Sequence, residues 1–200
     1  MQPEDIAAGY DQIADRWQSP SFNQDNGIAQ HQRAFQFGVS RGAALDIGCG
    51  CSGRIITLLQ DTGYAPEGLD LSVRTLELAK NRHPDTQFHH ADLCTWNPSK
   101  TYDFISAWDS IWHIPLDQQA PTLTKIINML SPGGIFIFTF GGLDEPSSMT
   151  NKDMDVPMYY STLGISGTLN VVQAAGAICR HMEFDQHPEP HVYVIAQAAL

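Results

Sequence analysis

A glycine-rich turn follows the first apolar run of the chain. Residues 43–47 are mostly apolar, and Gly48, Gly50 and Gly53 come directly after them. An apolar helical pattern begins beyond Gly53. Glycine lets a backbone approach a ligand closely, and the first turn of a helix has free N–H groups. The order of strand, glycine turn and helix therefore indicates an α/β fold with a ligand at this turn.

The chain then repeats this alternation of strand and helix. Further strands are predicted at 66–70, 88–92, 102–108 and 135–140. Helical patterns separate most of them, at 55–59, 73–79 and 123–130. A last helix near 171–175 precedes two strands, 177–184 and 192–196, which a proline-containing turn joins. The prediction is a doubly wound, Rossmann-like, seven-stranded sheet that is mostly parallel and has a C-terminal antiparallel hairpin.

Composition excludes several classes of partner. The formal charge of -11 opposes the phosphate neutralisation that nucleic-acid binding needs. No run of residues approaches the roughly 20 apolar positions of a membrane-spanning helix. The first 17 residues contain four acids and no long apolar run, unlike a signal peptide, so we expect a cytoplasmic protein. The four cysteines have no zinc-binding spacing, and we expect reduced thiols.

Three acidic side chains stand at the ends of successive predicted strands. Asp46 lies just before the glycine turn, Asp70 ends the second strand, and Asp92 ends the third. Because the carboxyl ends of parallel strands meet at one edge of a sheet, we expect these three carboxylates at the same edge. Each of them alone has a second interpretation as a helix cap or a turn residue. Together they suit a ligand that brings hydrogen-bond donors to this edge.

Five short motifs follow this arrangement. They are Leu-Asp-Ile-Gly-Cys-Gly at 45–50, Gly-Leu-Asp-Leu-Ser at 68–72, Ala-Asp-Leu at 91–93, Tyr-Asp-Phe-Ile at 102–105 and Leu-Ser-Pro-Gly-Gly at 130–134. With them the chain, from about Tyr10 onward, resembles the class I S-adenosylmethionine-dependent methyltransferases that act on small molecules. One departure is Ser52, which stands where the family usually has a third alternate glycine and precedes Gly53.

The resemblance implies S-adenosylmethionine as the cofactor and assigns its binding residues. Asp70 is expected to accept hydrogen bonds from both ribose hydroxyls, and Asp92 from the adenine amino group. Asp46 is expected to face the ammonium directly or through water. The implied cofactor-binding set is Asp46, Gly48, Cys49 and Gly50 at the methionyl end, Asp70 and Leu71 at the ribose, Asp92 and Leu93 at the adenine, and Trp108 closing the site.

Catalytic and substrate-binding residues are expected after the fourth strand and in two flanking segments. His113 is the candidate general base or substrate contact, because a neutral imidazole near pH 7 can accept a proton from an oxygen or nitrogen nucleophile. A helix cap or a backbone hydrogen bond is its alternative role. The candidate substrate residues are Tyr10, Trp17, Asp109, Trp112, Met158, Tyr159 and Tyr160.

The whole chain, 1–200, is expected to form a single methyltransferase domain. Its predicted parts are an N-terminal helical cap at 1–40, a cofactor-binding core at 41–142, a substrate lid loop at 143–163 and a C-terminal helix and hairpin at 164–200. The alternating His181, Glu183, Asp185 and His187 raise the possibility of a metal site, but an exposed strand face explains them better. We therefore expect no metal.

Two other functions stay open at this stage. A nicotinamide-dependent oxidoreductase also has a glycine turn and an acid about 20 residues later, although Asp46 before the turn argues against it. A non-catalytic sensor could keep the cofactor pocket and transfer nothing. The expected partner is a small-molecule substrate, with no nucleic acid and no membrane, for a monomer or a homodimer.

Overall fold

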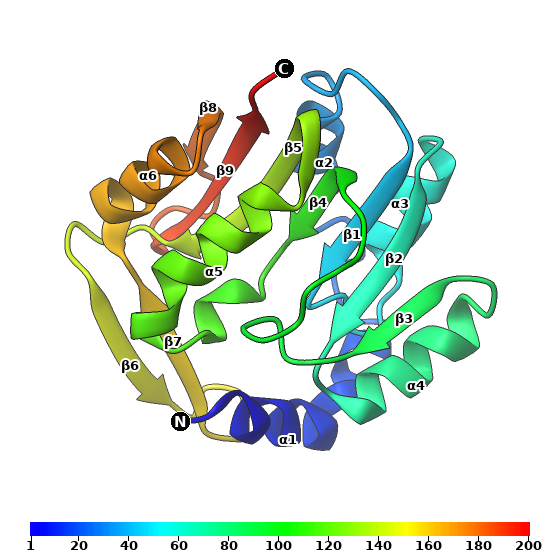
Figure 1. The fold of residues 1–200 in the computed structure, drawn as a ribbon. Helices are drawn as coiled ribbons and strands as arrows, with labels where there is room; N and C mark the ends of the chain where they lie inside the picture. Colours follow the sequence, from blue (N-terminus) through cyan, green and yellow to red (C-terminus); the bar gives the residue numbers. More distant parts are fainter.

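One central sheet organises the chain in the computed structural model, which describes all 200 residues (Figure 1). Its strands are β1 (Ala43–Ile47), β2 (Ala65–Asp70), β3 (Gln87–His90), β4 (Tyr102–Ala107), β5 (Leu130–Gly141), β8 (Ala177–Phe184) and β9 (His191–Ala198). They lie in the order β3-β2-β1-β4-β5-β9-β8. The first five are parallel, and β9 is antiparallel to both β5 and β8. The predicted seven-stranded, mostly parallel sheet with a C-terminal hairpin is confirmed.

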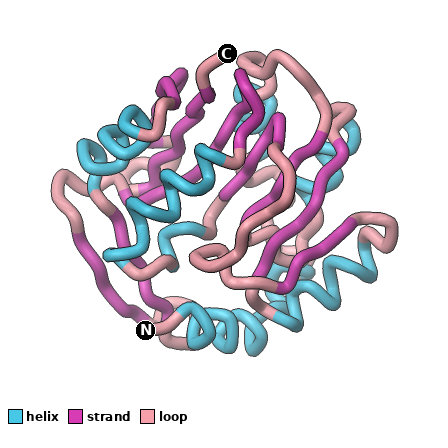
Figure 2. The backbone as a smooth tube through the Cα atoms, viewed as in Figure 1, coloured by secondary structure: helices cyan, strands magenta, loops and turns pink.

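Helices cover both faces of this sheet (Figure 2). They are α1 (Pro3–Ile13), α2 (Ile28–Ala34), α3 (Arg54–Asp61), α4 (Val73–Arg82), α5 (Leu116–Asn128) and α6 (Gly164–Ala174), with short 3-10 helices at Ala14–Gln18 and Ile111–His113. None of the helices is both long and apolar enough to cross a lipid bilayer.

Strand β5 separates two hydrophobic cores by the alternation of its side chains. Ile135 and Ile137 are fully buried in a cluster with residues of α2 and α3. Phe136 and Phe138 are fully buried in a larger cluster with residues of α5 and α6. Because successive side chains of a strand point to opposite faces, a continuous apolar run is buried on both faces of the sheet. Coverage on both faces explains why the sequence of 135–140 is almost continuously apolar.

The segment 143–163 differs from the predicted lid loop. It contains β6 (Ser147–Asn151) and β7 (Met158–Thr162), which pair antiparallel as a separate two-stranded sheet. Met158 on β7 packs with Ile6 and Ile13 of α1 in a small third core. The pairing of β6 with β7 provides hydrogen bonds for the backbone N–H and C=O groups of this polar segment. The strands were not predicted, because the segment shows little of the alternation of apolar and polar residues by which strands are recognised.

Helix α1 lies beside α4 and β7, next to the carboxyl ends of the parallel strands (Figure 1). Its residues line a cavity together with the loops that follow β1 and β4. The N-terminal segment therefore covers the edge at which the sequence places the ligand.

Candidate functional site

The turn after β1 is shaped by glycines in the left-handed region. Gly48 has a φ of +64°, and a Cβ added to it would lie 2.3 Å from the Cβ of Ser110. Gly50 has a φ of +55°, and a Cβ added there would meet no atom within 4 Å. Only glycine adopts such angles without strain. The backbone at Gly48 thus packs closely against the loop after β4, whereas the backbone at Gly50 borders open space.

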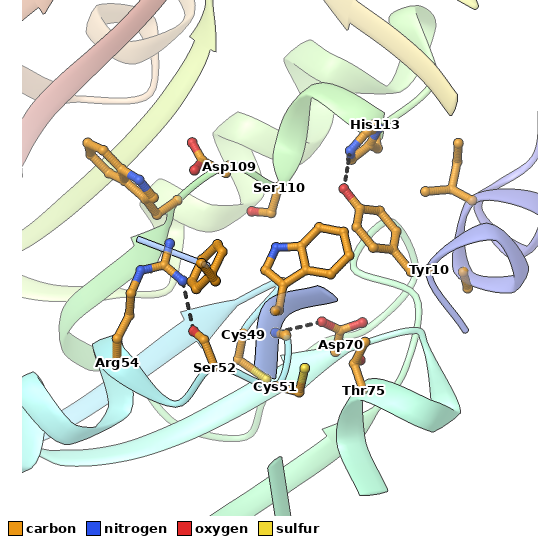
Figure 3. Close-up of a pocket in the computed structure, with 17 residues that line it drawn as sticks. Tyr10, Cys49, Cys51, Ser52, Arg54, Asp70, Thr75, Asp109, Ser110 and His113 are labelled. Atoms are coloured by element: carbon orange, nitrogen blue, oxygen red, sulfur yellow. Dashed lines mark hydrogen bonds between the residues drawn. The ribbon is translucent and has the colours of Figure 1, made fainter. Parts of the chain in front are cut away.

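Two cavities meet at this turn. The first, which we call the loop cavity, is lined by Tyr10, Trp17, Arg54, Asp70, Asp109 and His113 among others (Figure 3). The second, the side cavity, is lined by Asp92, Leu93 and neighbouring apolar residues. Both include Gly48, Asp70 and Ser110 in their walls. One elongated ligand can therefore extend across both.

The carboxylate of Asp70 stands at the junction of the two cavities. Its Oδ2 accepts a hydrogen bond from the backbone N–H of Gly50 at 2.9 Å, and its Oδ1 accepts one from Ser72 at 2.9 Å. Burial raises the pKa of Asp70, and these backbone hydrogen bonds oppose that rise. Each carboxylate oxygen has a second lone pair, so Asp70 can still accept hydrogen bonds from a ligand.

Asp46 lies deeper than the sequence suggests. It is 3% exposed near the end of β1 and belongs to the lining of neither cavity. Burial raises its pKa to about 7, against the opposing effects of a hydrogen bond with Ser106 and the nearby charge of Arg54. Asp46 is therefore buried behind the glycine turn and does not line the cavities directly.

Of the remaining cofactor-binding candidates, some line one of the two cavities and one does not. Asp92 and Leu93 line the side cavity, and Asp92 also accepts a hydrogen bond from the backbone of Cys94 at 2.9 Å. Trp108 lines the loop cavity at the end of β4 and donates to Asn26 Oδ1 at 3.2 Å. Leu71 lines neither cavity. Cys49 lines the loop cavity beside Gly48 and Gly50.

His113 is joined to Tyr10 of α1. Its Nδ1 lies 2.7 Å from the carbonyl oxygen of Tyr159, and because a carbonyl only accepts, this nitrogen carries the proton. Nε2 then accepts from the Tyr10 hydroxyl at 2.8 Å and from Trp112 Nε1 at 3.1 Å. Burial lowers the pKa of His113 to about 4, against the hydrogen bond to Tyr159 and the charge of Asp109. The imidazole is therefore neutral at pH 7.

Asp109 faces the loop cavity from a strained backbone. Its φ of 54° is one of only two positive values outside glycine in the chain. Its carboxylate accepts from Asn26 Nδ2 at 2.8 Å and from His191 Nε2 at 2.9 Å. Nδ1 of the same histidine lies 2.5 Å from Asp185. His191 on β9 thus links the cavity wall to the turn between β8 and β9.

The other candidate substrate residues do not all line the same cavity. Trp17 lines the loop cavity, with its ring 5.4 Å from that of Tyr10. Trp112 and Tyr160 line an outer cavity that also includes His191, Asp153 and Glu189. Tyr159 contributes its carbonyl to His113 and lines neither the loop cavity nor the outer cavity. Met158 is fully buried against α1 and lines none of these cavities, so the expected substrate contact is replaced by packing.

Arg54 is a site residue that sequence reasoning missed. It begins α3 directly after the glycine turn and lines the loop cavity. Its Nε donates to Asn26 O and its Nη1 to Ser52 Oγ, both at 2.8 Å, and the guanidinium lies over the ring of Phe22. The feature of the sequence that could have indicated this role is the presence of a cation directly after the glycine turn. Nothing local indicates that Asn26 and His191 reach the site, because only the tertiary fold brings them there.

The acidic and histidine residues of β8 have other partners. Arg33 of α2 hydrogen-bonds both His181 and Glu183. Asp185 turns to His191 instead, and no cluster of three or more His, Cys, Asp or Glu side chains is arranged to hold a metal ion. The four cysteines are free.

Comparisons with known proteins identify a family for the chain. Residues 22–166 match the family model described as a methyltransferase domain. The chain is 30% identical over 112 residues to trans-aconitate 2-methyltransferase of Rhizobium leguminosarum, a match covering 55% of this chain and 43% of that protein. It is 32% identical over 149 residues to phosphoethanolamine N-methyltransferase 3 of Arabidopsis thaliana, covering 71% and 28%. The chain thus spans less than half the length of these relatives.

A solved structure extends the likeness to the whole fold. Magnesium protoporphyrin IX methyltransferase of Synechocystis, solved with bound S-adenosylmethionine, superposes with a TM-score of 0.75 at 14% identity, covering 100% of this chain and 98% of that one. Because the family model matches well over half of the residues, the chain belongs to the class I S-adenosylmethionine-dependent methyltransferases, within the methyltransferase domain family.

Proposed function

We propose that this protein transfers the methyl group of S-adenosylmethionine to a small-molecule acceptor. The observation that carries the proposal is the position of Asp70, which lines both the loop cavity and the side cavity opposite Gly50. In an adenosine-containing ligand the ribose lies between the base and the rest of the molecule. A carboxylate at the junction therefore suits a ribose diol, with one end of the ligand in each cavity.

The donors and acceptors around the two cavities fit the proposed cofactor. Asp92 and Leu93 would hold the adenine in the side cavity, with Asp70 at the ribose. Gly48 and Gly50 would approach the methionyl end, and the open space beside Gly50 leaves room for it. Arg54 would pair with the carboxylate of that end, since a guanidinium binds carboxylates strongly. When bound, the cofactor supplies an electrophilic methyl group on a positively charged sulfur.

The size of the acceptor is limited by what covers the site. Ile6 and Tyr10 of α1 and Trp17 of the following 3-10 helix form part of the wall of the loop cavity. Helix α1 packs against Met158 of the β6–β7 hairpin. An acceptor must fit between these segments and the loop after β4, which favours a small molecule. The enclosure also contributes to catalysis, because a desolvated site holds the nucleophile in line with the methyl group.

Tyr10 and His113 provide a route for a proton. Tyr10 lines the loop cavity and donates its hydroxyl proton to Nε2 of the neutral His113. When an acceptor loses a proton to the Tyr10 oxygen, the phenolic proton passes to His113. The tautomer is already set by the carbonyl of Tyr159. Tyr10 is thus the group that meets the acceptor, and His113 is the base behind it.

Calorimetry and a turnover assay test the proposal. The protein should bind S-adenosylmethionine and S-adenosylhomocysteine, and should bind neither NAD nor NADH. Incubation with S-adenosylmethionine and a panel of small metabolites should release S-adenosylhomocysteine. Preferential binding of a nicotinamide cofactor would support the oxidoreductase instead. Tight cofactor binding with no methyl transfer to any member of the panel would support a sensor.

A further inference from the structure

The region that faces an acceptor is acidic. Asp109 lines the loop cavity, and Asp153 and Glu189 line the outer cavity. Arg54 is the only arginine or lysine in the lining of either cavity, and the proposed function assigns its N–H groups that are left after two protein hydrogen bonds to the carboxylate of the cofactor. A carboxylate or phosphate group of an acceptor would meet no free cation here. The charges favour an acceptor that is itself positively charged.

The carboxylate of Asp109 is held in a fixed orientation at the cavity wall. Its backbone N–H donates to the hydroxyl of Thr139 on β5 at 2.8 Å. Asn26 donates to Oδ2 and His191 donates to Oδ1. Three contacts from three parts of the chain therefore support a residue whose φ lies in the left-handed region. Each oxygen retains a lone pair for a further donor.

The cavity wall around Asp109 keeps a net negative charge even though His191 is positively charged. Both of its ring nitrogens face carboxylate oxygens, of Asp109 and Asp185. Because a carboxylate oxygen only accepts, both nitrogens donate, and the ring is an imidazolium. Burial lowers the pKa of His191, but the hydrogen bonds to the two carboxylates outweigh this and raise it overall. One positive charge is thus shared by two negative ones, and one negative charge remains.

Aromatic rings complete the same cavity. Tyr10, Trp17 and Trp108 line it together with Asp109. Figure 3 shows Asp109, Ser110 and His113 along one side of the cavity and Tyr10 beside His113. A cation over an aromatic face is attracted by the negative face of the ring, and a carboxylate nearby adds a charge-assisted hydrogen bond. This combination recognises an ammonium group better than a neutral or anionic one.

We propose that the acceptor is an amine that enters as its ammonium ion, with Asp109 as its counter-ion. This inference rests on the proposed function and names the substrate class of the same site. An ammonium has no free lone pair, so one proton first leaves through Tyr10 to His113. The nitrogen lone pair then forms the new N–C bond while the methyl–sulfur bond breaks, and the electron pair of that bond stays on sulfur. The product leaves as an N-methylammonium ion, and His113 releases its proton to solvent.

Binding to the complex with S-adenosylhomocysteine tests the substrate class without requiring turnover. Benzylammonium, benzyl alcohol and benzoate share one ring and differ in charge, and each is titrated into the saturated complex by calorimetry. We expect benzylammonium to bind at least about tenfold more tightly than the other two. Asp109→Asn should weaken benzylammonium binding about tenfold or more and should change the affinity for S-adenosylhomocysteine less than about twofold. Asp61→Asn, at an exposed position of α3, should change neither.

The outcomes separate the two proposals. Failure to bind S-adenosylhomocysteine would overturn the proposed function itself. Binding of the cofactor product with equal or tighter binding of benzoate, or with methylation of trans-aconitate in preference to amines, would overturn the amine assignment alone. So would unchanged benzylammonium affinity in folded Asp109→Asn. If that variant does not fold, His191→Gln serves instead: it removes the positive charge shared by Asp109 and Asp185, so it should increase the preference for the ammonium over the alcohol, and an unchanged preference would overturn the amine assignment.

Discussion

The hydroxyl of Tyr10 lies 2.8 Å from Nε2 of His113, although 103 positions separate the two residues in the chain. The phenol comes from a helix that precedes the sheet, and the imidazole comes from the short 3-10 helix that follows β4. His113 is the residue that the sequence proposes as a base, and its basic nitrogen is covered by Tyr10. Proton transfer from an acceptor therefore depends on both side chains.

Tyr10→Phe should reduce kcat strongly while leaving the cofactor bound. The substitution keeps the ring and removes only the oxygen that relays the proton. Positioned bases contribute about 100- to 10,000-fold, so we expect a loss of at least about 100-fold in kcat. The affinity for S-adenosylhomocysteine should stay within about twofold. Tyr64→Phe removes the same atom from a residue packed against α3 and should keep the wild-type rate. A wild-type kcat in Tyr10→Phe would leave catalysis to positioning alone.

The pH dependence of kcat should reflect the buried state of His113. Burial lowers its pKa to about 4, so the ring stays neutral and able to accept a proton well below pH 6.5. We expect kcat to change little between pH 5 and pH 8, whereas an imidazole with its ordinary pKa near 6.5 would lose about tenfold per pH unit below that value. Rates are measured with both substrates saturating. A steep fall beginning near pH 6.5 would contradict a buried base.

Asp70→Ala should weaken cofactor binding without unfolding the protein. Hydrogen bonds to a charged acceptor contribute about 1.5–3 kcal/mol each, so losing the two expected from the ribose should cost tenfold or more in affinity. The measurement is calorimetry with S-adenosylhomocysteine, accompanied by thermal unfolding. An affinity within twofold of wild type in a folded variant would remove Asp70 from the site.

His191 should contribute more stability at low pH than at high pH. Its folded-state pKa is raised above the ordinary 6.5, because its hydrogen bonds to Asp109 and Asp185 outweigh the effect of burial. A raised histidine pKa gives stability that is fully present below about 6.5 and is lost as the pH rises through the folded value. His191→Asn should lower the free energy of unfolding by about 1.5–3 kcal/mol at pH 6, and by less at pH 9.

Urea denaturation of both proteins between pH 6 and pH 9 measures this difference. His187→Asn provides the matched control, because His187 is exposed in the turn between β8 and β9. It should change the free energy of unfolding by less than about 0.5 kcal/mol at either pH. A deficit in His191→Asn that grows as the pH rises would show that the ring is neutral in the folded state.

Tyr64→Phe should keep or increase stability. The Tyr64 hydroxyl is buried and has no hydrogen-bond partner, although its ring packs 5.7 Å from that of Phe35 and 5.4 Å from that of Phe104. An unsatisfied buried hydroxyl costs about 1–3 kcal/mol, and removing it recovers part of that cost. Thermal unfolding should therefore show an equal or higher melting temperature. A clear decrease would mean that the hydroxyl has a partner.

The sequence alone determined the order of strands and helices and the edge of the sheet where the site lies. Strand β1 has the predicted bounds, and β8 does as well, because apolar runs between glycine or proline turns are local signals. Asp70 and Asp92 both line a cavity at this edge, since residues at the carboxyl ends of neighbouring parallel strands must share one edge.

Tertiary structure decided which side chains reach the cavities and in what state of charge. Asp46 and Met158 are buried away from the loop cavity. Arg54 lines that cavity, and His191 hydrogen-bonds Asp109 in its wall. The insertion of β9 between β5 and β8 brings His191 to Asp109, and the packing of α1 brings Tyr10 to His113. These contacts join residues about 80 to 100 positions apart, and the pKa values depend on the burial that the contacts create. Local patterns of apolar and polar residues contain neither kind of information, because both arise only when the elements pack together.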